Sequence, residues 1–267
     1  MLYKTDYHIH TTFSDGKADP EEYITSAIAA GLQEIGFSEH LNLGVADQEL
    51  NMDPGRIHEY ILHIEKLRKK NPDIKIKTGL EVDYFPGKEE EIYKFINGLD
   101  LDYVIGSVHY LVGENTVDSG PDYYENKNID EIYDSYFSLV NEAVASGLFD
   151  FIAHCDVVRI YNFMPTADPE HYYRILAEKL RIHDVAFEIN TNGRNRPLGD
   201  FYPDRRFLKI FREKNVPVCV NSDAHFPLRV GQYFDEAYML LRESGYKEMA
   251  VFNKRERYIV PADFYSF

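Results

Sequence analysis

Short β-branched or apolar runs alternate along this chain with longer stretches of helical periodicity. This alternation is typical of repeated βα units around a parallel sheet, because neighbouring parallel strands need a crossover, usually a helix. The expected strands cover residues 4–10, 34–38, 74–81, 103–108, 151–154, 185–190 and 216–221, with a weaker eighth at 249–252. We therefore expect a barrel of about seven βα units rather than an open sheet.

The segments between these strands have the amphipathic pattern of helices. The expected helices cover residues 20–30, 54–70, 88–97, 129–146, 169–182 and 204–214. Asp19, Asp53 and Asp168 each stand directly before a proline, which is a favourable helix start. No linker rich in Gly, Pro or Ser divides the chain. Residues 1–267, of which 44% are hydrophobic, are therefore expected to form one domain with a sizeable core.

Histidine and acidic residues gather at the ends of the expected strands. His8 and His10 end the first strand and Asp223 and His225 end the seventh, and side-chain alternation directs each pair to one face. In a parallel barrel, all strand ends of one kind meet on one face. The candidate metal ligands are His8, His10, Asp15, His40, Glu81, His109, His154, Asp223 and His225. The other four histidines, His58, His63, His171 and His183, fall in predicted helical stretches, where packing or solvation explains them.

This set of ligands indicates a class of metal and of reaction. Mixed imidazole and carboxylate ligands suit Zn, Mn or Fe better than Mg or Ca, and a carboxylate such as Glu81 can bridge two ions. A water shared between metals loses a proton near neutral pH and can attack phosphorus while the ions neutralise the phosphoryl oxygens. We therefore expect phosphoester hydrolysis without a covalent nucleophile. A closed coordination sphere would indicate a non-catalytic metal-binding protein instead.

Charge and hydropathy narrow the range of partners. The formal charge of -16 opposes binding to a nucleic acid backbone. No apolar run approaches the roughly 20 residues of a membrane span, and the first residues lack the apolar core of a signal peptide. We expect a cytoplasmic protein acting on a small phosphorylated metabolite, with its oligomeric state left open. Cys155 and Cys219 fit no CxxC pair and are expected to be small buried residues.

The strand-end motifs resemble those of the polymerase and histidinol phosphatase (PHP) superfamily over nearly the whole chain. The matching segments are His8-Ile9-His10 with Asp15, Ser38-Glu39-His40, Gly79-Leu80-Glu81, Gly106-Ser107-Val108-His109, Ala153-His154 and Asn221-Ser222-Asp223-Ala224-His225. The resemblance implies a distorted (β/α)7 TIM-like barrel that holds two to three divalent transition metal ions, Zn, Mn or Fe.

The resemblance also implies a division of the ligands. One metal would take His8, His10, Glu81 and Asp223, a second would share Glu81 and add His109 and His154, and a third would take Asp15, His40 and His225. Asp223 and His225 are the expected catalytic residues of this set.

Arginines near the same face are the candidates for binding phosphate, because the guanidinium fork matches phosphate oxygens. Arg159 follows the fifth strand, and Arg194 and Arg196 follow the sixth, the one strand without a predicted ligand. Of the three, the resemblance favours Arg159 and Arg196 as the residues that hold a phosphate. Asp156 and Glu39 are candidates for orienting the imidazoles from outside the ligand set.

The resemblance implies a phosphomonoesterase that hydrolyses L-histidinol phosphate to L-histidinol and phosphate. An acidic pocket would suit the cationic histidinol group. The alternatives within the family are nucleotides, oligonucleotides and phosphotyrosine, although a nuclease should carry a basic groove. An amidohydrolase barrel also begins with an HxH motif but commonly adds a bridging lysine, where this chain offers Glu81.

Overall fold

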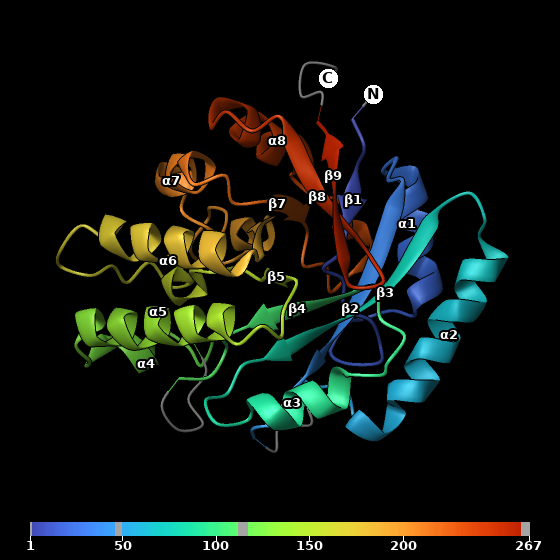
Figure 1. Cartoon of the computed structure of the whole chain (residues 1–267), viewed down its shortest axis with the longest axis horizontal. Coiled ribbons are helices and arrows are strands. Elements are labelled where there is room, and N and C mark those ends of the chain that lie inside the picture. The colour runs from blue at the N-terminus through green and yellow to red at the C-terminus, as the bar shows by residue number, and fades with distance from the viewer. Residues whose placement is uncertain (1, 46–49, 112–116, 263–267) are drawn as a thin grey trace.

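The computed structural model describes residues 2–45, 50–111 and 117–262. Seven strands form one sheet in the order of the sequence, and every neighbouring pair is parallel (Figure 1). The strands are β1 (Thr5–Asp6), β2 (Glu34–Leu41), β3 (Lys75–Asp83), β4 (Tyr103–Ser107), β5 (Phe151–Ile152), β6 (Ala186–Asn190) and β7 (Val218–Asn221). Each expected strand is therefore present, and most of them are buried along their whole length, as parallel strands covered on both faces require.

The sheet nearly closes on itself where the chain after β1 meets the chain after β7. Ile9 and Ala224 form a parallel bridge there. The backbone N–H of His10 donates to the carbonyl of Ala224 at 3.0 Å, and the N–H of Ala224 donates to the carbonyl of His8 at 3.1 Å. The predicted distorted (β/α)7 TIM-like barrel is therefore confirmed.

Two strand boundaries differ from the prediction in ways that matter for the site. The regular pairing of β1 stops at Asp6 instead of residue 10. Beyond Asp6, Ile9 forms a bridge with Ala224 after β7 and keeps a single backbone hydrogen bond with β2, from the N–H of Ser38. Strand β2 continues to Leu41, so His40 lies within the strand and not after it.

The helices lie around the strands (Figure 1). They are α1 (Pro20–Ala29), α2 (Ile57–Lys70), α3 (Glu89–Ile96), α4 (Asp122–Glu125), α5 (Ile129–Ala145), α6 (Glu170–His183), α7 (Leu208–Glu213) and α8 (Phe234–Glu243). Two of those in the described residues, α4 and α8, were not predicted. Helix α8 buries Phe234, Ala237, Tyr238 and Leu241, which is the i, i+3, i+4, i+7 spacing of an amphipathic helix. The pattern that identifies α8 was thus present in the sequence. Among the described residues, no helix has the length and apolar character needed to cross a membrane.

An antiparallel hairpin of β8 (Glu248–Asn253) and β9 (Glu256–Pro261) follows the barrel. Phe252 packs against Tyr7, Tyr103 and Phe151, with ring centroids 5.1–6.4 Å apart. Because Tyr103 and Phe151 begin their strands, the hairpin covers the amino end of the barrel. The weak eighth strand is therefore real but lies outside the barrel sheet, and the carboxyl ends of the strands stay available for a site.

Candidate metal centre

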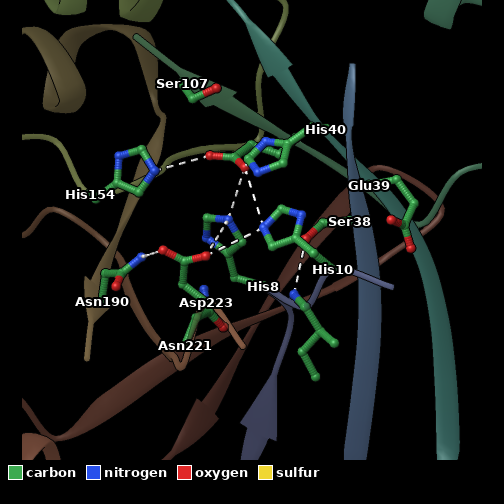
Figure 2. A network of polar contacts seen from close by, with 12 residues as sticks. His8, His10, Ser38, Glu39, His40, Ser107, His154, Asn190, Asn221 and Asp223 are labelled. Atoms are coloured by element: carbon green, nitrogen blue, oxygen red, sulfur yellow. Dashed lines mark hydrogen bonds and ion pairs between the residues drawn. The ribbon is translucent and has the colours of Figure 1, made fainter. Parts of the chain in front are cut away.

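The nine predicted ligands converge at the carboxyl ends of the barrel strands. His8 and His10 flank the bridge after β1, Asp15 lies in the following loop, His40 and Glu81 lie in β2 and β3, His109 and His154 follow β4 and β5, and Asp223 and His225 follow β7. Figure 2 shows the side chains of His8, His10, His40, His154 and Asp223 gathered around one point. Six of the nine, Asp15, His40, His109, His154, Asp223 and His225, line a cavity that opens above them.

Glu81 lies at the centre of the cluster and is fully buried. Its Oε2 atom lies 2.8 Å from Nδ1 of His40 and 3.1 Å from Nε2 of His8. Its Oε1 atom lies 3.1 Å from Nε2 of His154 and 3.8 Å from Nε2 of His109. The two oxygens therefore face different groups of imidazoles, which is the arrangement that a bridging carboxylate requires.

One group of ligand atoms comes from His8, His10, Glu81 and Asp223. Nε2 of His8 lies 3.1 Å from Glu81 Oε2 and 3.7 Å from Asp223 Oδ1, and Nε2 of His10 lies 3.5 and 3.4 Å from the same two oxygens. Ligands about 2.0–2.1 Å from a tetrahedral zinc are separated by about 3.3 Å. The observed spacings lie near that value, and the ligand atoms of His8, His10 and Asp223 are close enough together to hold one ion, with Glu81 beside the two imidazoles.

Two further groups lie on either side of the first. Nε2 of His109 lies 3.2 Å from Nε2 of His154, and both face Glu81. On the other side, Asp15 lies 3.2 Å from Nε2 of His225 and 3.7 Å from Nε2 of His40.

The groups overlap more than the predicted division implies. His10 also belongs to the set of Asp15, His40 and His225, and His40 also groups with Glu81 and His109. The assignment of each residue to one metal therefore remains a prediction.

Asp223 differs from the other ligands in its backbone. Its φ is 50°, in the left-handed region that non-glycine residues seldom adopt and that aspartate tolerates better than most. The residues after Asn221 thus form a turn rather than an extension of β7. The prediction that strand alternation pairs Asp223 with His225 was wrong in its geometry, although both side chains reach the cluster, with His225 Nδ1 3.5 Å from Asp223 Oδ1.

The hydrogen-bonding state of the ligand atoms tests whether a metal fits. Among the described residues, buried side-chain atoms without a hydrogen-bond partner include His8 Nε2, both ring nitrogens of His10, Asp15 Oδ1 and both carboxylate oxygens of Glu81. An unsatisfied buried polar atom costs about 1–3 kcal/mol. Such atoms facing one another are satisfied by a shared cation, and nitrogen and oxygen donors at these spacings fit divalent metal ions.

The charges of the cluster are strongly coupled. Burial alone would lower the pKa of His40, but the carboxylate of Glu81 raises it to about 10. Burial likewise opposes protonation of His8, yet Glu188 and Glu81 raise its pKa well above the usual value. His10 behaves in the opposite way, because burial and the neighbouring His40 lower its pKa to about 3. The free cluster thus holds protons that a metal ion must displace.

Two carboxylates that the sequence reasoning missed orient imidazoles of the cluster. Both oxygens of Glu188, in β6, lie 3.1 Å from Nδ1 of His8. Asp83, in β3, lies 2.9 Å from Nδ1 of His109. Asp83 stands two residues after Glu81, so strand alternation places both on one face and could have identified it. Glu188 could have been identified because it is an acidic residue within the otherwise apolar start of β6, where a buried charge needs a partner.

The two acids proposed for this orienting role do something else. Glu39 accepts hydrogen bonds from the hydroxyls of Thr11 and Ser14, and in Figure 2 it points away from the imidazoles. Asp156 accepts from Arg159 and from the hydroxyl of Tyr173. The prediction was wrong for Glu39 because it alternates away from the neighbouring His40 along β2, and for Asp156 because it lies in the turn after β5 and not in an extension of that strand.

The three candidate arginines lie in different surroundings. Arg196 lines the cavity, with its Nη1 3.6 Å from the carboxylate of Asp118. Arg159 is buried in an ion pair with Asp156 at 2.7 Å, and Arg194 pairs at 2.7 Å with a glutamate of α8. The structure therefore brings one of the three arginines, Arg196, to the lining of the cavity.

Comparisons with known proteins agree with this architecture. The model of the PHP domain family matches residues 6–192, which contain seven of the nine ligands. A probable histidinol-phosphatase of Deinococcus radiodurans is 32% identical over 90% of this chain and 93% of its own length. The histidinol-phosphatase of Lactococcus lactis is 29% identical over 94% of each chain.

A solved structure extends the likeness to three dimensions. The histidinol phosphate phosphatase of Lactococcus lactis, solved in complex with zinc, L-histidinol and phosphate, is similar with a TM-score of 0.84 and 28% identity. The alignment covers 97% of this chain and all of that one.

Proposed function

The chain belongs to the PHP domain family, and from this premise we propose that it is a metal-dependent phosphatase that hydrolyses L-histidinol phosphate to L-histidinol and phosphate. The observation that carries the proposal is the cluster of histidine and carboxylate ligands around Glu81, at the base of a cavity lined by Arg196. The similar proteins of D. radiodurans and L. lactis are named histidinol-phosphatases, which supports the choice of substrate.

The cluster would hold two to three divalent ions, of zinc, manganese or iron. His8, His10, Glu81 and Asp223 would hold one ion, His109 and His154 would share Glu81 with it to hold a second, and Asp15, His40 and His225 would hold a third. When bound, such ions activate water for attack on phosphorus and neutralise the phosphoryl oxygens. The close approach of the ligand atoms supports metal binding at this cluster, and the division among three ions rests on the family resemblance.

The residues of the cavity bind and orient the substrate. Arg196 donates hydrogen bonds to the phosphate, for which its planar fork is suited. Asp223 and His225 are the proposed catalytic residues, because both hold metal and both line the cavity. Asp118 and Asp83 make the lining acidic, which suits the cationic histidinol group.

The test is a screen of phosphate release by the metal-loaded protein. L-Histidinol phosphate should be hydrolysed with a higher kcat/KM than nucleotides, tyrosine phosphate or short oligonucleotides. Preference for one of the other substrates would replace the substrate in this proposal and leave the metal centre in place. Absence of turnover on every phosphoester, in a protein that retains its metal, would favour a non-catalytic metal-binding protein.

A further inference from the structure

Strand β6 contributes no ligand to the cluster, yet it carries a fully buried carboxylate, Glu188, against it. Burying a charge in a barrel is costly unless the charge is paired or hydrogen-bonded. In the described part of the chain, no lysine or arginine hydrogen-bonds to Glu188 or forms an ion pair with it. Its charged partner in the free protein is an imidazole, that of His8. The charge of Glu188 is therefore paired with a residue of the metal-binding cluster and not with a cation elsewhere in the described barrel.

Most of the hydrogen bonds to Glu188 come from the segments that carry the ligands. Nδ1 of His8 lies 3.1 Å from both oxygens, and the backbone N–H of His154 donates to Oε1 at 2.9 Å. The amides of Asn190 and Asn221 donate at 2.8 and 2.7 Å. Four donors, from β6, from β7 and from the segments after β1 and β5, thus meet at one carboxylate.

The contact to His8 decides which ring nitrogen is available. A carboxylate that accepts from Nδ1 fixes the proton there and leaves Nε2 with its lone pair. Nε2 of His8 faces Glu81 at 3.1 Å and Asp223 at 3.7 Å. Nε2 of His8 also has no hydrogen-bond partner among the described residues. The ring is thus held in the orientation that a metal ligand needs, and loss of the Nε2 proton leaves it in the matching tautomer.

The same carboxylate is connected to a second ligand. The amide nitrogen of Asn190 lies 2.8 Å from Glu188 and 3.3 Å from Oδ2 of Asp223. Oδ1 of Asp223 then remains directed toward His8 and His10.

We propose that Glu188 is a positioning residue of the metal centre. Its carboxylate holds His8 with a proton on Nδ1 and, through Asn190, keeps the carboxylate of Asp223 directed toward His8. The inference rests on the metal dependence of the proposed function. Its test measures metal binding without substrate, so a wrong choice of phosphoester leaves the result unaffected.

The experiment compares zinc affinity, by competition with a chromogenic chelator, in the wild-type protein and in Glu188→Gln. The amide of glutamine replaces one hydrogen-bond acceptor by a donor and so favours the tautomer of His8 with its proton on Nε2. Zinc affinity should therefore fall about 10- to 100-fold, as it does when other hydrogen-bond partners of metal-binding histidines are replaced. The metal-free variant should retain the circular dichroism spectrum of the wild-type protein.

The matched control is Glu34→Gln. Glu34 is also a buried strand carboxylate, but it accepts from Tyr3, Tyr7 and Lys75 and contacts no ligand. Its zinc affinity should change by less than about twofold, because no metal-bound histidine depends on it. An equal loss in this variant would overturn the proposal.

A second variant separates positioning from charge and serves if Glu188→Gln does not fold. Glu188→Asp keeps the negative charge but withdraws the oxygens by one methylene from His8. Under the proposal its zinc affinity falls several-fold below the wild-type value. Wild-type affinity in Glu188→Asp would overturn the proposal, since charge alone would then be sufficient.

Discussion

The guanidinium of Arg196 lies 3.6 Å from the carboxylate of Asp118, and both side chains line the cavity above the ligand cluster. Arg196 follows β6 and Asp118 follows β4, so the contact joins two loops across the mouth of the site. The pair is partly exposed, and such contacts contribute little to stability. Arg196 can therefore exchange Asp118 for a phosphate at small cost.

Replacing Arg196 should weaken substrate binding. A hydrogen bond to a charged group contributes about 1.5–3 kcal/mol, so Arg196→Ala should raise KM for L-histidinol phosphate on the order of 10- to 100-fold. Steady-state kinetics measure the effect. Arg205→Ala is the matched control, because Arg205 is exposed, pairs with Asp200 and lies outside the cavity lining. An unchanged KM in Arg196→Ala would remove Arg196 from the phosphate site.

Replacing the central ligand should abolish turnover. Glu81→Gln removes the negative charge that faces His8, His40 and His154. Metal content and kcat/KM should both fall by more than about 100-fold. This loss exceeds the largest one typical of residues that only hydrogen-bond to metal ligands. Metal analysis and phosphate release measure the two losses. His58→Ala is the control, since His58 lies exposed on α2. Full activity in a metal-depleted Glu81→Gln would contradict the proposed function.

Metal binding should release protons at pH 7.5. Burial lowers the pKa of His40, but Glu81 raises it to about 10, and Glu188 and Glu81 raise that of His8. Both rings are thus protonated in the free protein at this pH, and each must lose a proton to bind metal. Affinity should therefore increase with pH up to the raised pKa values and decrease as pH falls. Calorimetric titrations in buffers of different ionisation enthalpy count the protons, and a heat independent of the buffer would contradict this expectation.

Removal of metal should destabilise the protein without unfolding it. The barrel has its own apolar interior, in which Phe252 packs against Tyr7 and Phe151, so the fold does not depend on the ions. An ion at 100 times its Kd stabilises the folded state by about 2.7 kcal/mol, which corresponds to a shift in Tm of roughly 5–11 °C. Thermal unfolding with and without chelator measures it. Loss of secondary structure at 25 °C on chelation would show that the ions are needed for folding.

The alternation of strand and helix signals predicted the barrel, because parallel strands covered by helices give continuous apolar runs that differ from helical periodicity. Helix α8 was missed although its apolar spacing was present, and the early end of β1 was not foreseeable, because the chain beyond it forms a bridge with the distant segment at Ala224. Local sequence does not encode which distant strand a residue meets.

The sequence by itself determined which residues can bind metal and at which end of the barrel they lie, since strand ends gather on one face of any parallel barrel. Only the tertiary structure decided how they are held. Glu188 reaches His8 across 180 positions of sequence because the barrel closes between β1 and β7. Barrel closure and loop packing also decided that Arg196 lines the cavity, whereas Arg159 is buried in an ion pair with Asp156. Residue type and spacing fix the chemistry that a strand end offers, whereas distances between side chains of different strands depend on how the whole barrel packs.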